Sequence, residues 1–479
     1  MTEAGDKPLP FVLAIASFRR AFWVSIAMET IERLAYFGVR VVVPIYIASS
    51  EDPGGLHFKN EQKGTILALW ALVQTLVPMF SGGYADRYGR KRTIAVSILI
   101  KVSGYLLMAT QRSFGGFLFG CLTLAAGTAL FKPGLWGTVA AGIHPKNSSV
   151  GWGIFYWVIN VGGFLGPPLA GFLHAFSWKW VFVSCAVIVS LNLPLLLTYE
   201  DAPGSGTDSP AKVFVQSISK LFKRPRALVF ILVASLYYCM FMQLFDALPN
   251  FIEEWTESSD IVLALGLEEG HLARATPRGL QVPQEWMINL DSGAILLFMI
   301  PVSALVARAK LLRVMLLGIL LSCAGLLLAG GSMRGFLCIA GIALFAVGEM
   351  LASPKVNEYL ALIAPKGEEA LYMGYANIPF AIGWTTGAYV AGHVYGALAD
   401  KANLANRYLT EHVAMATPIP RTEAMSRLQE ATHTSASDAT RLLWDTYHPY
   451  TFWYGFVVVG ILSAIGMLVY ARLVNRWKA

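Results

Sequence analysis

Charged residues are scarce in this sequence. Asp, Glu, Lys and Arg together make up 14% of the 479 residues, whereas hydrophobic residues make up 56%. An average soluble protein has about 25% charged residues, so too few are present for a water-facing surface of this size. Long apolar runs take their place, and about 20 such residues are enough to cross a hydrocarbon core about 30 Å thick. The composition therefore predicts an integral membrane protein.

Metal-binding and catalytic patterns are also missing. The five cysteines all stand singly in apolar runs, with no CxxC pair and no histidine cluster, so we expect buried thiols rather than disulfides or a metal site. No HExxH or GxSxG motif occurs, which argues against an enzyme. The first apolar stretch is too long for a signal peptide and is interpreted as the first membrane helix. We expect no cofactor.

Apolar segments recur in two sets. Each has the length of a membrane helix, and the predicted spans are 19–48, 62–84, 93–110, 115–142, 150–174, 178–198, 227–251, 287–308, 312–330, 335–364, 371–398 and 450–474. They predict an all-α membrane protein of about twelve helices in two pseudo-symmetric six-helix bundles. The bundles would be residues 1–198 and 227–479, joined by a polar cytoplasmic linker at 199–226. The loops at 252–286 and 399–449 are expected outside, without assigned chemistry.

The net charge of +7 is explained by topology. Short loops that lie inside, if both termini are cytoplasmic, hold most of the Lys and Arg outside the long 399–449 loop, as the positive-inside rule requires. We therefore expect a multi-pass protein of the cell inner membrane, surrounded by lipid, with no nucleic acid partner. We expect it to function as a monomer.

Charges inside the apolar segments carry the functional prediction, because a charge at the bilayer centre is costly unless it faces a cavity or a partner. They are Glu29, Glu32, Arg33, Arg40, Lys101, Lys132, Asp246, Glu349, Lys355 and Glu358. Glu29, Glu32 and Arg33 are spaced i, i+3 and i+4, on one helical face, and Arg40 follows two turns later. This stripe is expected to line a polar cavity and exchange protons. The alternative is a buried ion-pair network that only fixes helix packing.

Two further charges occupy corresponding helices of the two halves. Lys132 precedes Pro133-Gly134, which could break the fourth helix, and Glu349 lies midway along the tenth. A Lys132–Glu349 pair could close the inner side when formed and open it when broken. Lys101 fits two interpretations equally, reaching toward the membrane surface or joining the charged network.

Five short motifs resemble those of a known family. The loop GGYADRYGRKR at 82–92 resembles the signature of the major facilitator superfamily, with Asp86 and Arg90 at its cytoplasmic face. The segment ETIERLAYFG at 29–38 looks like the ExxER motif of the proton-dependent oligopeptide transporters. FKP at 131–133, FYWVINVG at 155–162 and GEMLASP at 348–354 resemble later motifs of the same family, in the same order.

The resemblance implies roles for these residues. Glu29, Glu32 and Arg33 would form the proton-coupling cluster. The substrate pocket would contain Tyr36, Arg40, Lys132, Asn160 and Glu349. Gating would involve Asp246, Lys132, Glu349, Asp86 and Arg90. The expected activity is proton symport of di- or tripeptides, or a related small zwitterion, by alternating access.

Departures from the family pattern fall mostly in the pocket. Phe37 replaces a tyrosine, Gly134 an asparagine, and Thr75 aligns with another tyrosine. The usual eleventh-helix tryptophan is missing around 374–377, and the linker is too short for the two extra helices of many bacterial members. Met242 replaces a seventh-helix acid, so we expect Asp246 to act as the partner of Arg40.

Two other functions remain open from the sequence. Proton-coupled efflux of drugs or metabolites on the same fold would suit the 13 Trp and 27 Phe, although aromatic belts at the membrane interfaces also explain them. A transporter-like receptor that binds its ligand without moving it is the second. The intact set of coupling charges favours transport over such a receptor.

Overall fold

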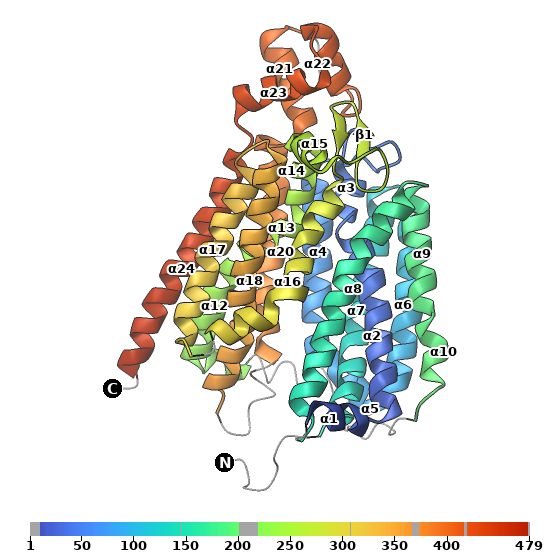
Figure 1. Cartoon of the computed structure of the whole chain (residues 1–479), viewed down its shortest axis with the longest axis vertical. Helices are drawn as coiled ribbons and strands as arrows, with labels where there is room; N and C mark the ends of the chain where they lie inside the picture. Colours follow the sequence, from blue (N-terminus) through green and yellow to red (C-terminus); the bar gives the residue numbers. More distant parts are fainter. Residues whose placement is uncertain are drawn as a thin grey trace. The chain divides into compact units, whose positions relative to one another are not determined.

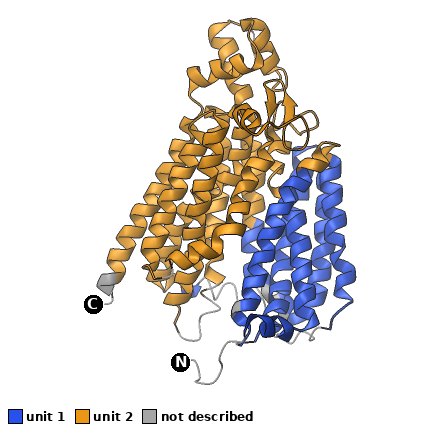
Figure 2. Ribbon diagram, in the orientation of Figure 1, with its two compact units in different colours: residues 1–39, 73–170, 179–220 blue, residues 40–72, 171–178, 221–479 orange. Residues whose placement is uncertain are grey.

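The computed structural model describes residues 10–144, 146–200, 219–306, 308–365, 372, 374–415 and 419–477, and helices dominate them (Figure 1). The chain divides into two compact units (Figure 2). Unit 1 is residues 1–39, 73–170 and 179–220, and unit 2 is residues 40–72, 171–178 and 221–479. Helices α2, α4 and α8 each contribute residues to both units. The predicted division at 199–226 into two six-helix bundles stays a prediction.

Unit 1 is built on long helices packed side by side. Its helices are α1 (Phe11–Ser17), α2 (Arg20–Arg40), α5 (Pro78–Tyr88), α6 (Arg90–Thr110), α7 (Phe114–Ala141), α8 (Ser148–His174), α9 (Trp178–Ser190) and α10 (Asn192–Leu196). Helices α6 and α7 approach closely at Gly104, which has no side chain. A Cβ at this position would lie only 2.6 Å from the backbone nitrogen of Leu124. Small residues serve helix contacts in membranes in this way. A buried cluster around Ile94, Ile98 and Phe131 fills the space between α6, α7 and α2.

Unit 2 contains the remaining helices and one short hairpin. They are α3 (Val43–Ala48), α4 (Asn60–Leu76), α12 (Pro225–Phe241), α13 (Gln243–Asp246), α14 (Leu248–Trp255), α15 (Ser259–Leu265), β1 (Arg274–Thr276), β2 (Gly279–Gln281), α16 (Gln284–Val306), α17 (Leu311–Gly330), α18 (Gly335–Ile363), α20 (Asn377–Leu398), α21 (Lys401–His412), α22 (Ala424–Thr432), α23 (Ala436–Tyr447) and α24 (Thr451–Trp477). Helix α18 packs against α16 and α17, and α12 packs against α20 and α24. The antiparallel hairpin pairs Arg274 with Gln281.

Nine helices in the described part of the chain are long and apolar enough to cross a membrane, or ten if α1 and the segment Arg20–Ala48 form one bent span. The two other predicted spans are also helical. The segment 62–84 is divided at Val77, where Pro78 begins α5, and α20 covers most of 371–398. Proline fits the first turn of a helix because its missing N–H would have no partner there. The all-α membrane fold is confirmed, and most of the predicted linker lies outside the described residues.

The predicted break in the fourth helix does not occur. Helix α7 runs from Phe114 to Ala141 with Pro133 inside it. Neighbouring helices and local adjustments can compensate for the hydrogen bond that a proline removes in a membrane helix. The expectation that Pro133-Gly134 breaks this helix is therefore wrong.

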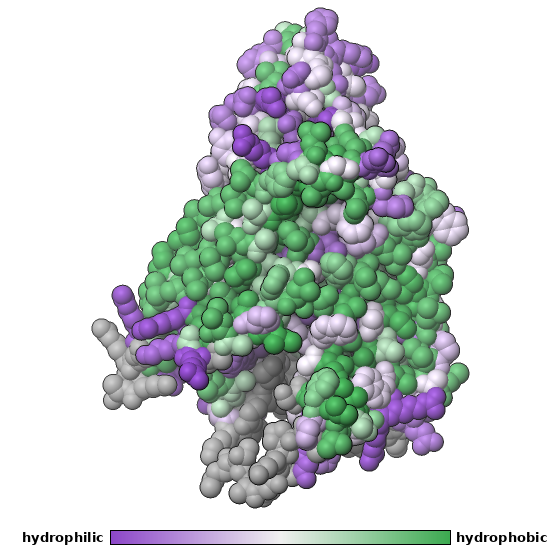
Figure 3. Space-filling model, in the orientation of Figure 1, coloured by the Kyte–Doolittle hydropathy of each residue, from purple (hydrophilic) through white to green (hydrophobic). Residues whose placement is uncertain are grey.

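The two loops expected outside are folded. Residues 252–286 contain the end of α14, α15 and the hairpin, and residues 399–449 contain α21, α22 and α23. Leu404, Leu428 and Leu443 are buried, one on each of α21, α22 and α23, and these three helices pack against one another. On the face shown in Figure 3, hydrophobic side chains cover α17 and α24, whereas hydrophilic side chains gather over α21–α23. This pattern fits lipid-facing spans below a water-facing insertion in unit 2.

Candidate functional site

The charged stripe of α2 forms a buried cluster in unit 1. The α2 charge cluster consists of Glu29, Glu32 and Arg33 together with Lys101 of α6, and none of these residues is more than 6% exposed. Because side chains at i, i+3 and i+4 share one helical face, α2 presents both acids and the arginine to the same neighbours. The cluster contains two acids and two bases, so its formal charges balance.

Ion pairs connect the members of the cluster unequally. Glu32 contacts both Arg33 and Lys101, while Glu29 contacts Arg33 alone, with 3.3 Å between Arg33 Nε and Glu29 Oε1. Among the described residues, Glu29 Oε2 has neither a hydrogen bond nor an ion pair, whereas Glu32 Oε2, which also lacks a hydrogen bond, forms the ion pair with Arg33. Lys101 joins the network rather than reaching toward the membrane surface, which answers the question that the sequence left open. Glu29 is therefore the carboxyl with a free oxygen for a proton.

Two glycines make room for the cluster. A Cβ on Gly162 of α8 would lie 2.5 Å from Arg33 Cβ, and a Cβ on Gly127 of α7 would lie 2.7 Å from Lys101 Cγ. No larger residue fits at either position without movement of the charged side chain. The glycines therefore fix how closely α7 and α8 approach the charges.

Substitution of Gly162 by alanine is expected to reduce transport about tenfold. The added methyl group would displace Arg33, and overpacking of this kind typically costs about 1–3 kcal/mol. Initial uptake rates measured beside thermal unfolding test this expectation. Gly153, on the same helix with nothing within 4 Å of its would-be Cβ, supplies the matched control. Equal losses in Gly162→Ala and Gly153→Ala would contradict the proposed steric cause.

The other predicted residues of unit 1 lie around this region. Gln74 Nε2 donates to the Tyr36 hydroxyl at 2.8 Å, and the Arg33 guanidinium lies 5.0 Å from the Tyr36 ring centre. On α8, the Asn160 amide donates to the Tyr156 carbonyl at 2.9 Å. The contact from Gln74 was not predicted from the sequence.

The signature loop is partly helical. Arg90 begins α6, and its Nε lies 3.2 Å from the position of a Cβ on Gly137 of α7. Asp86 falls on α5, and its side chain lies outside the described part of the structure. The gating roles expected for Asp86 and Arg90 therefore stay predictions.

Lys132 and Glu349 belong to different units. In unit 1, Lys132 lies on α7 close enough to Glu29 and Glu32 for electrostatic interaction. In unit 2, Glu349 lies on α18 and its Oε2 has no hydrogen-bond partner among the described residues. Their pairing stays a prediction. The nearby Lys355 forms a 2.6 Å ion pair with Glu358 on the same helix.

Arg40 and Asp246 form a buried ion pair in unit 2. Their side chains are 3% and 1% exposed, and Arg40 also lies 3.4 Å from the carbonyl oxygen of Phe245. Trp384 of α20 donates its indole N–H to Asp246 Oδ2 at 2.9 Å, and Arg40 stacks 5.0 Å above the same indole. The structure thus contains the contact expected from the sequence, and adds Trp384 as its third member.

A second polar network in unit 2 surrounds α14. The α14 polar network consists of buried or half-buried residues from α4, α14, α20 and the 399–449 insertion: Asn60, Lys63, Asn250, Glu254, Tyr395, Asp400 and Arg421. Lys63 Nζ donates to Asn250 Oδ1 at 2.9 Å, and the Tyr395 hydroxyl donates to Glu254 at 2.8 Å. The network was not found from the sequence, because its contacts between helices join residues 141 to 340 positions apart.

The insertion contributes directly to this network through Arg421. Its Nη1 lies 2.6 Å from Asp400 Oδ2, and its Nη2 donates to the Ala48 carbonyl at 3.1 Å. Asn60 Nδ2 donates to the same Asp400 carboxylate at 2.6 Å. Arg421 therefore ties the insertion to both α4 and the end of α3.

Burial raises the pKa of Glu254 to about 8, and the Asp400 carboxylate adds to this shift. Glu254 lies on α14, beyond the membrane span that ends at Asp246. The folded chain therefore holds a proton on Glu254 that the unfolded chain has already lost between pH 4.5 and about 8. Stability from this group is greatest at low pH and falls as the pH rises through that window.

Substitution of Glu254 by glutamine is expected to remove this pH dependence. The free energy of unfolding of the wild type, relative to Glu254→Gln, should fall by up to about 1.4 kcal/mol per pH unit across the window. Thermal unfolding of both proteins in detergent from pH 5 to about pH 8 measures the difference. Parallel stability curves for the two proteins would contradict a buried, protonated Glu254.

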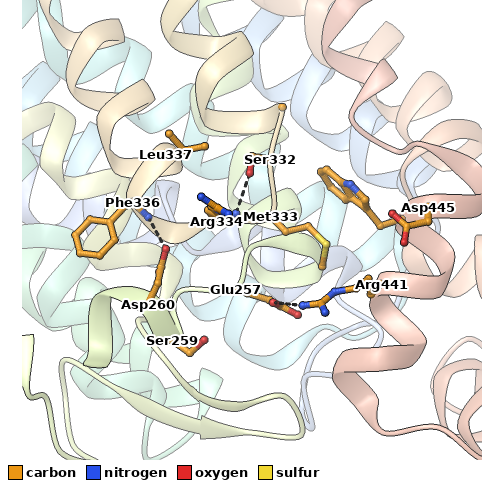
Figure 4. A pocket seen from close by; sticks show the side chains of 12 residues that line it. Glu257, Ser259, Asp260, Ser332, Met333, Arg334, Phe336, Leu337, Arg441 and Asp445 are labelled. Carbon is orange, nitrogen blue, oxygen red and sulfur yellow. Dashed lines mark hydrogen bonds and ion pairs between the residues drawn. The ribbon is translucent and has the colours of Figure 1, made fainter. Parts of the chain in front are cut away.

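A pocket in unit 2 lies between the two folded insertions (Figure 4). Arg441 of α23 reaches Glu257 at 3.3 Å, and Asp260 accepts a hydrogen bond from the backbone N–H of Phe336 at 3.1 Å. Arg441, Glu257 and Asp260 lie outside the candidate membrane spans, and the Arg441 side chain is 60% exposed. The pocket has no buried charge of the kind found in the α2 charge cluster, so it is not the preferred functional site.

The Major Facilitator Superfamily profile matches residues 26–267. The peptide transporter YePEPT of Yersinia enterocolitica is 29% identical over 160 residues, which cover 32% of this chain and 31% of that protein. The multidrug resistance protein MdtH of Shigella sonnei is 22% identical over 373 residues, covering 75% of this chain and 83% of that protein.

Solved structures share the fold over nearly the whole chain. The crystal structure of a peptide transporter POT in complex with sulfate matches with a TM-score of 0.67, at 15% identity, over 98% of each chain. The nucleoside transporter NupG matches with a TM-score of 0.69, at 12% identity, over 94% of this chain and 100% of that one. The chain therefore belongs to the Major Facilitator Superfamily, and it is a multi-pass membrane transporter rather than an enzyme.

Proposed function

We propose that this chain is a proton-coupled symporter that imports di- or tripeptides, or a related small zwitterion, by alternating access. The observation that carries the proposal is the α2 charge cluster. Buried charges in a membrane protein are costly and commonly mark ion or proton pathways. Here they coincide with the segment that resembles the ExxER motif, and one carboxylate oxygen of Glu29 is available to a proton.

Proton exchange would act on the balance of charge in the cluster. Glu32 has two cationic contacts and Glu29 has one. Adding a proton to Glu29 disturbs fewer ion pairs than adding one to Glu32, so Glu29 is proposed as the first acceptor. Once Glu29 is protonated, its ion pair with Arg33 weakens, and Arg33 can strengthen its contact with Glu32. Because Glu32 also contacts Lys101 of α6, the protonation state would affect how α2 packs against α6.

Residues of both charge signs are proposed to bind the substrate. A zwitterion needs a cation for its carboxylate and an anion for its ammonium group. Arg40 and Lys132 would supply the first and Glu349 the second, with Tyr36 and Asn160 as hydrogen-bonding groups. Peptide is the proposed substrate because of the resemblance to peptide transporters, including the partial match to YePEPT.

Gating is proposed for ion pairs that form and break during the cycle. The Arg40–Asp246 pair, supported by Trp384, would close the outer side. A Lys132–Glu349 pair would close the inner side, with Asp86 and Arg90 holding the cytoplasmic ends of helices. The proposal keeps the topology expected from the sequence, with both termini in the cytoplasm and the protein in the cell inner membrane, and it takes the monomer as the functional unit.

Uptake into proteoliposomes tests the proposed function. The purified protein is offered a panel of dipeptides, tripeptides and amino acids with an acidic outer buffer. Accumulation above equilibrium that disappears when the pH gradient is collapsed is the expected result. Absence of accumulation for every peptide, together with proton flux caused by another solute, would contradict the peptide assignment.

Efflux of drugs or metabolites is the second candidate, and a specific observation favours it. The MdtH relatives align over about three quarters of this chain, much further than the peptide transporter does. Efflux would be proton antiport, so the same vesicles would load a substrate when the inside is acidic. Expression in a drug-sensitive host, with and without Glu32→Gln, distinguishes the two directions.

A further inference from the structure

Two acids in unit 2, one buried and one half-buried, lack a cationic partner among the described residues of that unit. Asp291 lies on α16 and is 1% exposed, and Glu349 lies on α18, which packs directly against α16. Asp291 Oδ1 and Glu349 Oε2 are both buried without a hydrogen-bond partner among the described residues. Neither acid forms an ion pair with a described residue of unit 2. Asp291 lies inside the predicted span 287–308 but was not among the charges singled out from the sequence.

The two carboxyls are close enough to interact electrostatically. The Tyr237 hydroxyl of α12 also interacts electrostatically with Glu349, and it lies within 3.2 Å of the Ser353 hydroxyl. A tyrosine hydroxyl is neutral and brings no positive charge. The described surroundings of the pair in unit 2 are therefore apolar or neutral.

The two neighbouring carboxyls need positive charge to compensate them. Two neighbouring carboxylates in a low-dielectric site cannot both stay ionised without a compensating cation. Lys132, the expected partner of Glu349, carries a single positive charge and can compensate one carboxylate at most. A proton compensates the other and also turns one carboxyl into a donor, so that it can bond to the unpartnered oxygen of its neighbour.

We propose that Asp291 and Glu349 form a carboxyl pair that binds one coupling proton, in addition to the proton of the α2 charge cluster. The proposal rests on the proposed function of proton-coupled transport. The proton is taken from water as an O–H bond to one carboxylate, shared with the other by a hydrogen bond, and returned to water on the opposite side. The transporter would therefore move two protons with each substrate.

Accumulation measured against the pH gradient tests this number. One pH unit corresponds to about 1.4 kcal/mol per proton, which is a tenfold concentration ratio. With the membrane potential held at zero, the wild type is expected to approach about hundredfold accumulation per pH unit, and Asp291→Asn about tenfold. An unchanged limit in Asp291→Asn would overturn the proposal. If the wild type shows no proton-driven uptake at all, the proposed function fails instead.

Infrared spectroscopy of the purified protein provides a test that does not need transport. The Glu254→Gln background removes another buried carboxyl that would overlap. A protonated-carboxyl stretching band is expected at neutral pH. Asp291→Asn should remove it, because Lys132 then compensates the charge of the Glu349 that remains. Glu349→Gln should shift its frequency, because the hydrogen bond between the two carboxyls is lost. A spectrum without such a band, or a band that stays unchanged in both variants, would overturn the pair.

Discussion

Replacement of Glu32 by glutamine is expected to abolish proton-driven accumulation while leaving counterflow exchange. Glu32 forms ion pairs with both Arg33 and Lys101. A neutral glutamine at this position removes the negative charge that balances these two cations, so proton binding in the cluster can no longer change the ion pairs. Exchange of substrate for substrate does not require the proton to be released, and it should continue. The wild type should accumulate substrate at least about tenfold per pH unit, whereas Glu32→Gln should stop at equal concentrations.

Two further variants separate coupling from folding. Glu32→Gln leaves two buried cations with less negative charge, so thermal unfolding must be measured beside transport. Glu29→Gln removes the acid with fewer ion pairs and is expected to lose accumulation at a smaller cost in stability. Glu358→Gln, on an exposed part of α18, is the matched control. Full accumulation by Glu29→Gln and Glu32→Gln would mean that the cluster only fixes helix packing.

Substitution of Asp246 by asparagine is the second change expected to have a large effect. It leaves the Arg40 guanidinium buried without its counter-ion, and loss of one partner of such a pair typically costs about 3–5 kcal/mol. The indole N–H of Trp384 can still donate to the amide oxygen, so the geometry around Trp384 should survive. Transport is expected to fall more than about tenfold. The conformation whose outer side is closed by this ion pair would be strongly destabilised, so the transport cycle would rarely reach it.

A double variant shows whether the pair acts as a unit. Arg40→Gln combined with Asp246→Asn removes both charges, and it should recover much of the stability that either single change loses. Arg441→Ala, which breaks the exposed pair with Glu257, should change stability by less than about 1 kcal/mol. Additive losses in the double variant, or wild-type transport by Asp246→Asn, would contradict the gate.

The fold was largely predictable from the sequence, because membrane spans are local features. A run of apolar residues must be helical in lipid, where each backbone group needs a hydrogen bond within its own segment. The predicted tenth span, 335–364, corresponds to α18 from Gly335 to Ile363. The error at Pro133 has a non-local cause, since the membrane and the neighbouring helices maintain a helix that the proline alone would weaken.

The α2 stripe was predictable for the same reason. Spacing along one helix places Glu29, Glu32 and Arg33 on one face without knowledge of the other helices. The Arg40–Asp246 contact joins residues that are far apart in the chain, and it was expected through a resemblance rather than a pattern. Trp384, the third member of that contact, gave no local signal because one tryptophan among 13 is most simply explained by the membrane interface.

The remaining polar contacts could not be predicted because they depend on tertiary packing. Arg421 lies in a polar insertion and looks like any solvated arginine until the fold brings it to Asp400. Asp291 stands close to the start of α16, where an acid would ordinarily face water, yet it is 1% exposed. Burial of this kind is a property of neighbouring helices, so spacing and composition do not reveal it.

Movement of protons caused by substrate is the most direct test of coupling through the α2 charge cluster. Proteoliposomes loaded with a pH-sensitive dye, and held at an inside-negative potential, are given a dipeptide that the uptake panel has identified. The wild type should acidify the interior only when the peptide is added, and Glu32→Gln should not respond. Peptide uptake without any acidification in the wild type would contradict proton coupling.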